Sequence, residues 1–184
     1  MEEDDQGAPL TKAMSALLIN FIHEEVQMSG VDAAVFRHHI EVEEIHDPAL
    51  KNLLRFMRQF REERLEERFF EERFGKELPY LTREEFTSIC SESFSNGRMT
   101  WSKLVLIFLF ASRLVIRAIT DNNPDKIKDI VGWTQDCTQG DFLEWCKSEC
   151  NWVDYLSFVI KHNWKEALAL LGVSLIIIFV ICKY

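Results

Sequence analysis

The sequence predicts an all-α protein, a globular helical bundle around a buried hydrophobic central helix, with a C-terminal transmembrane tail anchor. Apolar residues recur at intervals of three and four along most of the 184 residues, which is the spacing of one helix face. The chain has only 7 Gly and 4 Pro but 14 Phe, a composition typical of packed helices. One uncharged apolar run near the C-terminus approaches the length that spans a membrane.

Charge and cysteine content disfavour several classes of protein. The 21 Lys and Arg residues against 30 Asp and Glu give a net charge of −9, which disfavours binding to nucleic-acid phosphates. Residues 1–9 begin with Met and a run of acidic residues, so we expect a flexible acidic segment and no secretory signal. The 5 Cys form no regular framework, so we expect reduced thiols and a protein that faces the cytosol.

Two helices are predicted in the first part of the chain. Apolar spacing predicts an amphipathic helix over residues 10–29, and Gly30 stands where such a helix ends. No helix is predicted in the short stretch that follows, which is rich in Val and Ala. Asp47 and Pro48 then supply an N-cap and a proline at the first helical position, which open the second helix. Its continuation at 61–74 alternates acidic and basic residues and is typical of a solvated helix.

Three further helix signals follow. Thr82 and Glu85 form a capping box that begins a helix running to about Phe94. Residues 101–111 are apolar on every side of a helix, so other helices must surround this segment. Asn-Pro at 123–124 starts the next helix. One face of that helix is predicted to carry Ile127, Ile130, Val131 and Trp133.

We expect residues 10–163 to form one bundle and residues 164–184 to form a membrane anchor. The run at 167–182 contains no charge. As a helix it spans roughly 24 Å, short of a hydrocarbon core of ~30 Å, so Trp164 and Lys183 are expected to act as interfacial ends. Two alternatives are an apolar core helix and a helix stored against the protein itself.

No arrangement of residues in the sequence supports catalysis. The chain has no Gly-rich phosphate-binding loop and no nucleophile elbow. His38 and His39 are adjacent, so on a helix they point about 100° apart and match no metal-ligand spacing. Cys146 and Cys150 lie four apart, but two further zinc ligands are lacking at ordinary spacing. We therefore expect no enzyme activity, no metal and no cofactor.

Short motifs occur in a recognisable order at 16–22, 95–103 and 131–134, and again at Trp145 and Trp152. With these motifs the sequence resembles the Bcl-2 family of apoptosis regulators, and it is similar above all to the pore-forming effectors of that family. Residues 16–22 look like the family's fourth homology motif and residues 95–103 like its first. Trp145 and Trp152 stand at the spacing of the second motif, with 131–134 in the preceding helix.

The resemblance implies an apolar groove that accepts an amphipathic helix from a partner. It places this groove among Phe86, Phe94, Trp101, Ser102, Lys103, Leu104, Val105 and Phe108. Lys103 stands where the family has the Arg that pairs with an Asp of the ligand, and Ser102 replaces the family's Gly. Ordinary core packing is the alternative for the apolar members, whereas Lys103, at the edge of an apolar run, needs water or a partner carboxylate.

The resemblance also implies a degenerate third motif at Leu50, Leu54, Met57, Arg58 and Gln59. Its apolar spacing matches the family's ligand helix, but Arg58 and Gln59 stand where Gly and Asp belong. A register shifted one residue back puts Met57 and Arg58 there instead. Gly permits close approach to the receiving helix and Asp pairs with its basic residue, so we expect this helix to be a poor ligand for a partner's groove.

Two functions follow from the resemblance. The first is an effector that binds amphipathic death-motif helices in its groove, inserts in the mitochondrial outer membrane, oligomerises and permeabilises it. The alternative is a pro-survival protein that sequesters pro-apoptotic helices, which the loss of Gly and Asp from the third motif favours. Both imply other family members and membrane lipid as partners, homo- or hetero-oligomers, and no nucleic acid. Both imply the cytosol and the mitochondrial outer membrane as locations, with the endoplasmic reticulum as a further site.

Overall fold

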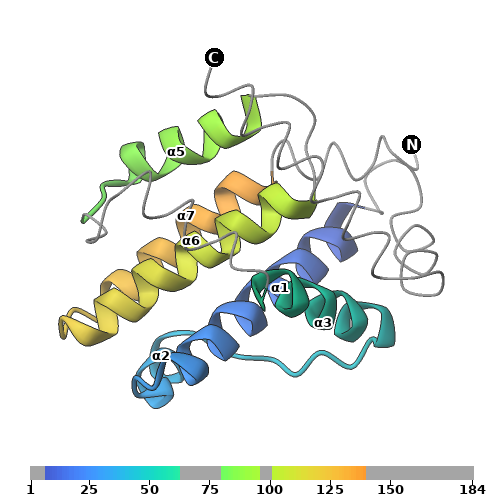
Figure 1. Cartoon of the computed structure of the whole chain (residues 1–184), viewed down its shortest axis with the longest axis horizontal. Helices are drawn as coiled ribbons and strands as arrows, with labels where there is room; N and C mark the ends of the chain where they lie inside the picture. Colours follow the sequence, from blue (N-terminus) through green and yellow to red (C-terminus); the bar gives the residue numbers. More distant parts are fainter. Residues whose placement is uncertain (1–6, 63–79, 96–100, 140–184) are drawn as a thin grey trace.

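The fold was analysed in a computed structural model, which describes residues 7–62, 80–95 and 101–139. These ranges contain helices and no strand, which confirms the all-α prediction for this part of the chain. The helices are α1 (Gly7–Ser29), α2 (Ala33–His39), α3 (Pro48–Glu62), α5 (Arg83–Ser95), α6 (Trp101–Thr120) and α7 (Lys126–Gln139). Figure 1 shows α6 and α7 side by side, with α1 against them.

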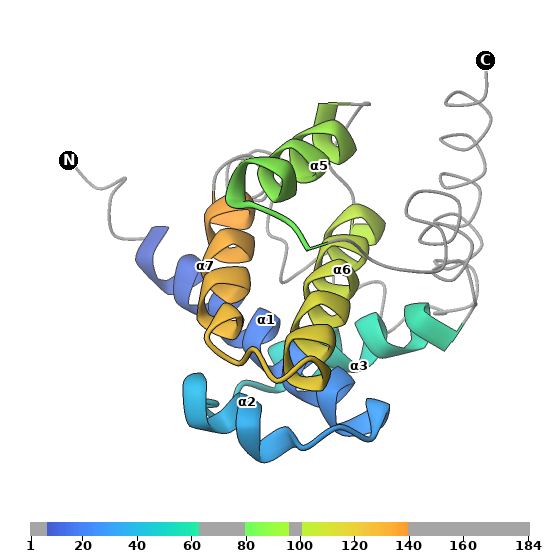
Figure 2. The same cartoon turned by 90° about the vertical axis from the view of Figure 1, so that its left-hand side faces the viewer.

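Helix α6 is the centre of the bundle. It packs most extensively against α1 and α7, and it also contacts α3 and α5. In both Figure 1 and Figure 2, α5 and α2 lie on opposite sides of this central layer. The buried apolar residues of α6 are Leu104, Val105, Ile107, Phe108, Leu109, Phe110, Ala111, Leu114, Val115 and Ala118. These positions cover all sides of the helix, so the prediction of a buried hydrophobic central helix is confirmed.

The first two helices differ from the prediction at their ends. Helix α1 begins at Gly7, three residues before the predicted start, and includes Pro9. A proline is tolerated there because the N–H groups of the first turn have no partner within the helix. Gly30 has φ +81° and ends α1 as predicted. Helix α2 was not predicted, although Asp32 caps it by accepting a hydrogen bond from the Ala34 N–H at 2.9 Å.

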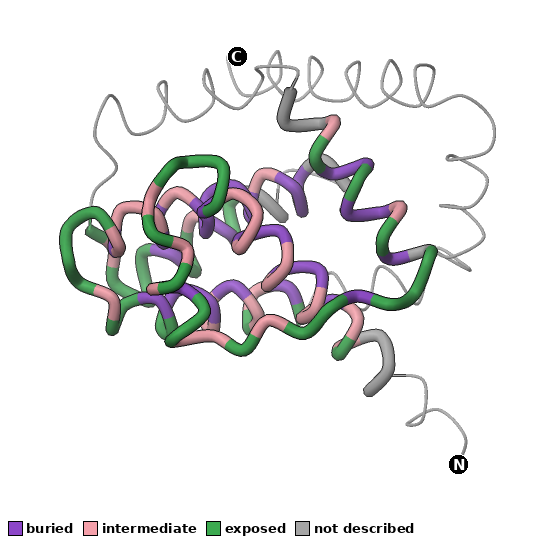
Figure 3. Tube along the Cα trace, turned by 90° about the horizontal axis from the view of Figure 1, so that it is seen from below, coloured by how far each residue is buried: buried purple, intermediate pink, exposed green. Residues whose placement is uncertain are grey.

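Helix α5 begins where the local signal predicts, whereas α7 begins at Lys126, two residues after the Pro124 that was predicted to start it. The Thr82 N–H donates to Glu85 Oε2 at 2.8 Å, and the Glu85 N–H donates to Thr82 Oγ1 at 3.3 Å, so the capping box is confirmed. Between α6 and α7 the chain turns through Asn122, which has φ +53°. Asn adopts this left-handed conformation more readily than most residues. Figure 3 shows that buried positions recur along the helices, whereas the connections between them are mainly exposed.

Several predicted features lie outside the residues that the structure describes. They are the anchor at 164–184, Trp145, Trp152, Cys146, Cys150, and most of the charged helix at 61–74. Among the helices that the structure does describe, none is both long enough and apolar enough to cross a membrane.

Candidate functional site

The predicted third-motif helix, α3, turns its apolar side into the bundle. Leu50, Leu53, Leu54, Phe56 and Met57 are all buried, whereas Lys51 and Arg55 on the other side are exposed. The buried side faces α1 and α6, the two helices that α3 contacts most. An amphipathic helix buried in this way offers no apolar face to a partner. Helix α3 can therefore act as a ligand only after it separates from α1 and α6.

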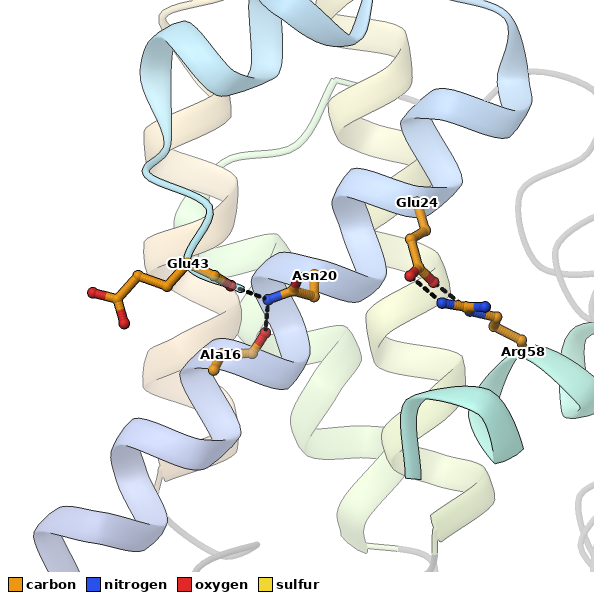
Figure 4. A network of polar contacts seen from close by, with 5 residues as sticks. All are labelled: Ala16, Asn20, Glu24, Glu43 and Arg58. Carbon is orange, nitrogen blue, oxygen red and sulfur yellow. Dashed lines mark hydrogen bonds and ion pairs between the residues drawn. The ribbon is translucent and has the colours of Figure 1, made fainter. Parts of the chain in front are cut away.

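A two-point ion pair holds α3 on α1 at the position where the sequence departs from the third motif. Both Nε and Nη2 of Arg58 donate to the carboxylate of Glu24 (Figure 4). The side chains of Arg58 and Glu24 are 46% and 23% exposed, so water screens the pair in part. The planar guanidinium matches a carboxylate in this arrangement, which a Lys in its place would not reproduce. The Arg58 guanidinium is therefore already paired with a carboxylate of the same chain.

A second contact fixes the chain that leads into α3. The side-chain amide of Asn20 on α1 donates to the carbonyl oxygens of Ala16, at 2.9 Å, and of Glu43, at 3.0 Å (Figure 4). Glu43 lies in the segment between α2 and α3. Asn20 and Glu24 are one turn apart on α1, so the same side of that helix contacts the connection and α3 itself.

The predicted groove residues whose side chains are described lie inside the core. Phe86, Leu104, Val105 and Phe108 have no exposed surface, and Lys103 is 5% exposed. Burying a lysine is costly unless other groups compensate its charge, so the buried Lys103 needs compensation from groups of the chain around it. The structure does not describe the side chains of Phe94, Trp101 and Ser102.

The predicted groove residues Phe86 and Phe108 belong to different sides of α6, because Phe108 is part of α6 and Phe86 packs on it from α5. The ring of Phe108 lies 5.8 Å from that of Phe21 on α1. The ring of Phe86 instead stacks on Phe110 at 5.5 Å and lies 6.0 Å from Trp133 on α7. Phe108 and Phe110 point about 200° apart on the helix, because each residue advances it by about 100°. The structure therefore separates Phe86 from Phe108, and the contacts with Phe21 and Phe110 were missed because they depend on how the helices cross.

A polar cluster joins the turn between α6 and α7 to the start of α5. The Tyr80 hydroxyl donates to the Asp121 carboxylate, which also accepts a hydrogen bond from Arg117 Nε at 3.1 Å. These two hydrogen bonds, first from Tyr80 and then from Arg117, lower the pKa of Asp121. The Arg117 guanidinium also lies 4.1 Å from the centre of the Tyr80 ring. The cluster links the end of the α6–α7 hairpin to the segment before α5.

Comparison with known proteins identifies the family of this fold. A sequence model described as "Apoptosis regulator proteins, Bcl-2 family" matches residues 41–152, which include α3, α5, α6 and α7. The chain belongs to the Bcl-2 family. The resemblance inferred from the sequence motifs is thereby confirmed.

Two curated Bcl-2 relatives indicate which branch of the family the chain resembles. It is 35% identical over 83 residues to the "Apoptosis regulator BAX" of Bos taurus and 34% identical over 83 residues to that of Homo sapiens. Each match covers 45% of this chain and 43% of the relative, so the similarity extends over less than half of either protein. The chain is thus a Bcl-2 family apoptosis regulator with local similarity to Bax.

A solved structure supports the Bcl-2 fold over most of the molecule. The crystal structure of chicken BOK superposes with a TM-score of 0.60 and 17% sequence identity. The superposition covers 83% of this chain and 97% of the BOK chain. At this identity the similarity concerns the fold alone. The arrangement of helices around α6 is therefore shared although most side chains differ.

Proposed function

We propose that this Bcl-2 protein is a Bax-like effector that inserts in the mitochondrial outer membrane, oligomerises and permeabilises it. The observation that carries the proposal is the burial of α6: its buried apolar residues lie on all sides of the helix, and it packs against α1, α3, α5 and α7. An effector needs such a helix, because one arm of its membrane-bound hairpin has to tolerate lipid all round.

The free energy of exposing α6 to water supports the proposal that α6 enters lipid when the bundle opens. Its eight buried Leu, Ile, Val and Phe side chains would cost roughly 12 to 24 kcal/mol if water replaced their surroundings. That cost is comparable to or larger than the whole stability of an ordinary domain, about 5 to 15 kcal/mol. An opened bundle therefore needs another apolar phase for α6, and a bilayer supplies one.

Helix α7 supplies the second arm of the hairpin. Its buried residues Ile127, Ile130 and Val131 lie on one side, whereas Lys128 and Asp129 are exposed. Such an amphipathic helix can lie at the boundary between lipid and water. We propose that α6 and α7 move to the membrane together, with the tail at 164–184 as anchor and the endoplasmic reticulum as a secondary membrane.

The partners proposed for this protein are other Bcl-2 family members and their amphipathic helices. A partner helix would dock along α6 at Leu104, Val105 and Phe108, with Lys103 facing its Asp. All four residues are buried, so docking requires that the bundle first opens beside α6. In this proposal the groove is a feature of the opened state, and an activating helix binds by stabilising that state.

The alternative is a pro-survival protein that sequesters pro-apoptotic helices. One observation favours it: Arg58 of α3 is bound to Glu24 in place of the family's Gly-Asp pair. A third-motif helix held in this way is not readily exchanged between copies, whereas effectors assemble by that exchange. The two functions therefore differ in whether α3 leaves the bundle.

Dye release from liposomes of outer-mitochondrial lipid composition distinguishes the two functions. The purified full chain is added with and without an activating amphipathic peptide that carries the family's Asp. An effector releases the dye, and the peptide increases the rate. A chain that releases nothing and also blocks the leakage caused by another effector is the pro-survival protein. Liposomes that lack anionic outer-mitochondrial lipids serve as the matched control.

A further inference from the structure

Helices α5 and α7 are packed so that two cysteines face each other. Arg83 Nη2 lies 2.8 Å from Asp136 Oδ2, and the rings of Phe86 and Trp133 are 6.0 Å apart. Four residues beyond Phe86 and Trp133 come Cys90 and Cys137. Residues four apart lie on the same side of a helix, so Cys90 and Cys137 lie on the sides of α5 and α7 that face each other.

The two thiols are free and touch each other. The Cys90 sulfur, with 1% of the residue exposed, lies within hydrogen-bonding reach of the sulfur of the half-buried Cys137. The hydrogen bond between the two sulfurs lowers the pKa of Cys137, which Thr87 also contacts. The same bond and burial raise the pKa of Cys90. Cys137 is therefore the accessible sulfur that ionises first, and Cys90 is the protonated sulfur beside it.

We propose that Cys90 and Cys137 are a modification site, at which a hydroperoxide oxidises them to an intramolecular disulfide between α5 and α7. The Cys137 thiolate attacks the peroxide, the O–O bond breaks, and Cys137 becomes a sulfenic acid while hydroxide or an alkoxide leaves. The Cys90 sulfur then attacks the Cys137 sulfur, the S–O bond breaks, and water leaves with the Cys90 proton. The peroxide is reduced by two electrons, and the two thiols are oxidised by two.

The disulfide has a structural consequence for the bundle. It closes a covalent loop that contains the whole of α6, Trp101–Thr120, between α5 and α7. The hairpin of α6 and α7 then cannot separate from α5. On the proposed function, which this consequence assumes, the oxidised protein is held closed and a thiol reductant releases it.

Peptide mapping of the full chain tests the disulfide without reference to activity. The protein is treated with hydrogen peroxide, remaining thiols are alkylated, and the digest is analysed under non-reducing conditions. We expect a linked peptide joining Cys90 to Cys137, two hydrogen atoms lighter than the separate peptides and lost on reduction. A Cys146→Ser and Cys150→Ser variant should still form it. Linkage of Cys137 mainly to another cysteine, or a Cys90 that stays alkylatable after oxidation, overturns the proposal.

Single variants test the order of the two steps. Cys90→Ser should let Cys137 accumulate as a sulfenic acid, which dimedone traps, whereas Cys137→Ser should leave Cys90 unoxidised. Because Cys90 is buried, circular dichroism checks the fold of each variant, and Cys90→Ala replaces Cys90→Ser if the hydroxyl disrupts the core. Oxidation of Cys90 in the Cys137→Ser variant contradicts the assigned roles.

Dye release then tests the consequence separately. Oxidised protein should lose peptide-induced release and regain it on reduction, while Cys137→Ser should be insensitive to peroxide. If the disulfide forms and release is unchanged, the bond does not hold the bundle closed. If neither the reduced nor the oxidised protein releases dye, the proposed function fails while the mapped disulfide stands.

Discussion

Replacing Glu24 with Gln removes the charge that holds Arg58 and leaves every residue of α3 unchanged. The Arg58–Glu24 pair is bidentate, which strengthens it, but Arg58 is 46% exposed, which weakens it through solvent screening. We therefore expect the free energy of unfolding to fall by about 1 kcal/mol. If this loss affects only the free energy of detaching α3 from the bundle, the population of molecules with α3 detached rises about fivefold.

Two measurements check this expectation. Urea unfolding gives the change in stability, and hydrogen exchange of α3 peptides shows whether the loss is local to that helix. Exchange should accelerate in α3 more than in α6. Glu43→Gln is the matched control, because Glu43 is also an acidic residue near α1, but its pair with Lys12 is a single contact at 3.9 Å between two largely exposed side chains. The control should change stability by less than about 0.5 kcal/mol.

A double-mutant cycle isolates the pair itself. Glu24→Gln, Arg58→Gln and the double variant should show a coupling energy of about 1 kcal/mol, since each single change already removes the interaction. Additivity within about 0.3 to 0.5 kcal/mol would refute the reasoning. In that case the contact in Figure 4 contributes nothing measurable to holding α3 in place.

Four further outcomes are expected. Arg58→Gly with Gln59→Asp should speed dye release and increase cell death on overexpression, because it restores the third motif and removes the pair with Glu24; protection of cells would contradict the effector assignment. Lys103→Glu should weaken binding of peptides that carry the family's Asp by about 1 to 3 kcal/mol, with recovery by an Asp→Lys peptide, as titration calorimetry would measure. Deletion of residues 165–184 should prevent carbonate-resistant association with mitochondria, and a truncated protein that still resists extraction argues against the anchor. Burial lowers the pKa of His23 below its usual 6.5, so the unfolded state binds more protons and stability should fall as pH drops through that value; His23→Gln should flatten this slope in urea titrations.

The starts of α3 and α5 could be predicted because their signals are local. The capping box of Thr82 and Glu85 requires only residues three apart, and Asp47 with Pro48 fixes the start of α3 in the same way. Helix α2 was missed because its seven residues are too few to show a period, although Asp32 carried a capping signal. Short-range chemistry therefore specifies the starts of α3 and α5.

The contacts of the candidate site could not be predicted in the same way. Arg58 and Glu24 are 34 positions apart, and their pairing depends on where α3 crosses α1. Phe86 lies in α5 and Phe108 in α6, and only the packing of these two helices shows that Phe86 meets Phe110 instead. Sequence spacing defines one face of each helix, but it does not determine which faces of different helices meet.

Arg58 has two separable effects on the function of α3. It removes the Gly that allows close approach to a partner's groove, and through Glu24 it holds α3 on α1. Arg58→Gly with Gln59→Asp changes both effects together, whereas Glu24→Gln changes only the second. If retention of α3 limits activity, Glu24→Gln alone accelerates dye release. If recognition limits it, only the restored motif does, because a detached α3 that still carries Arg58 remains a poor ligand.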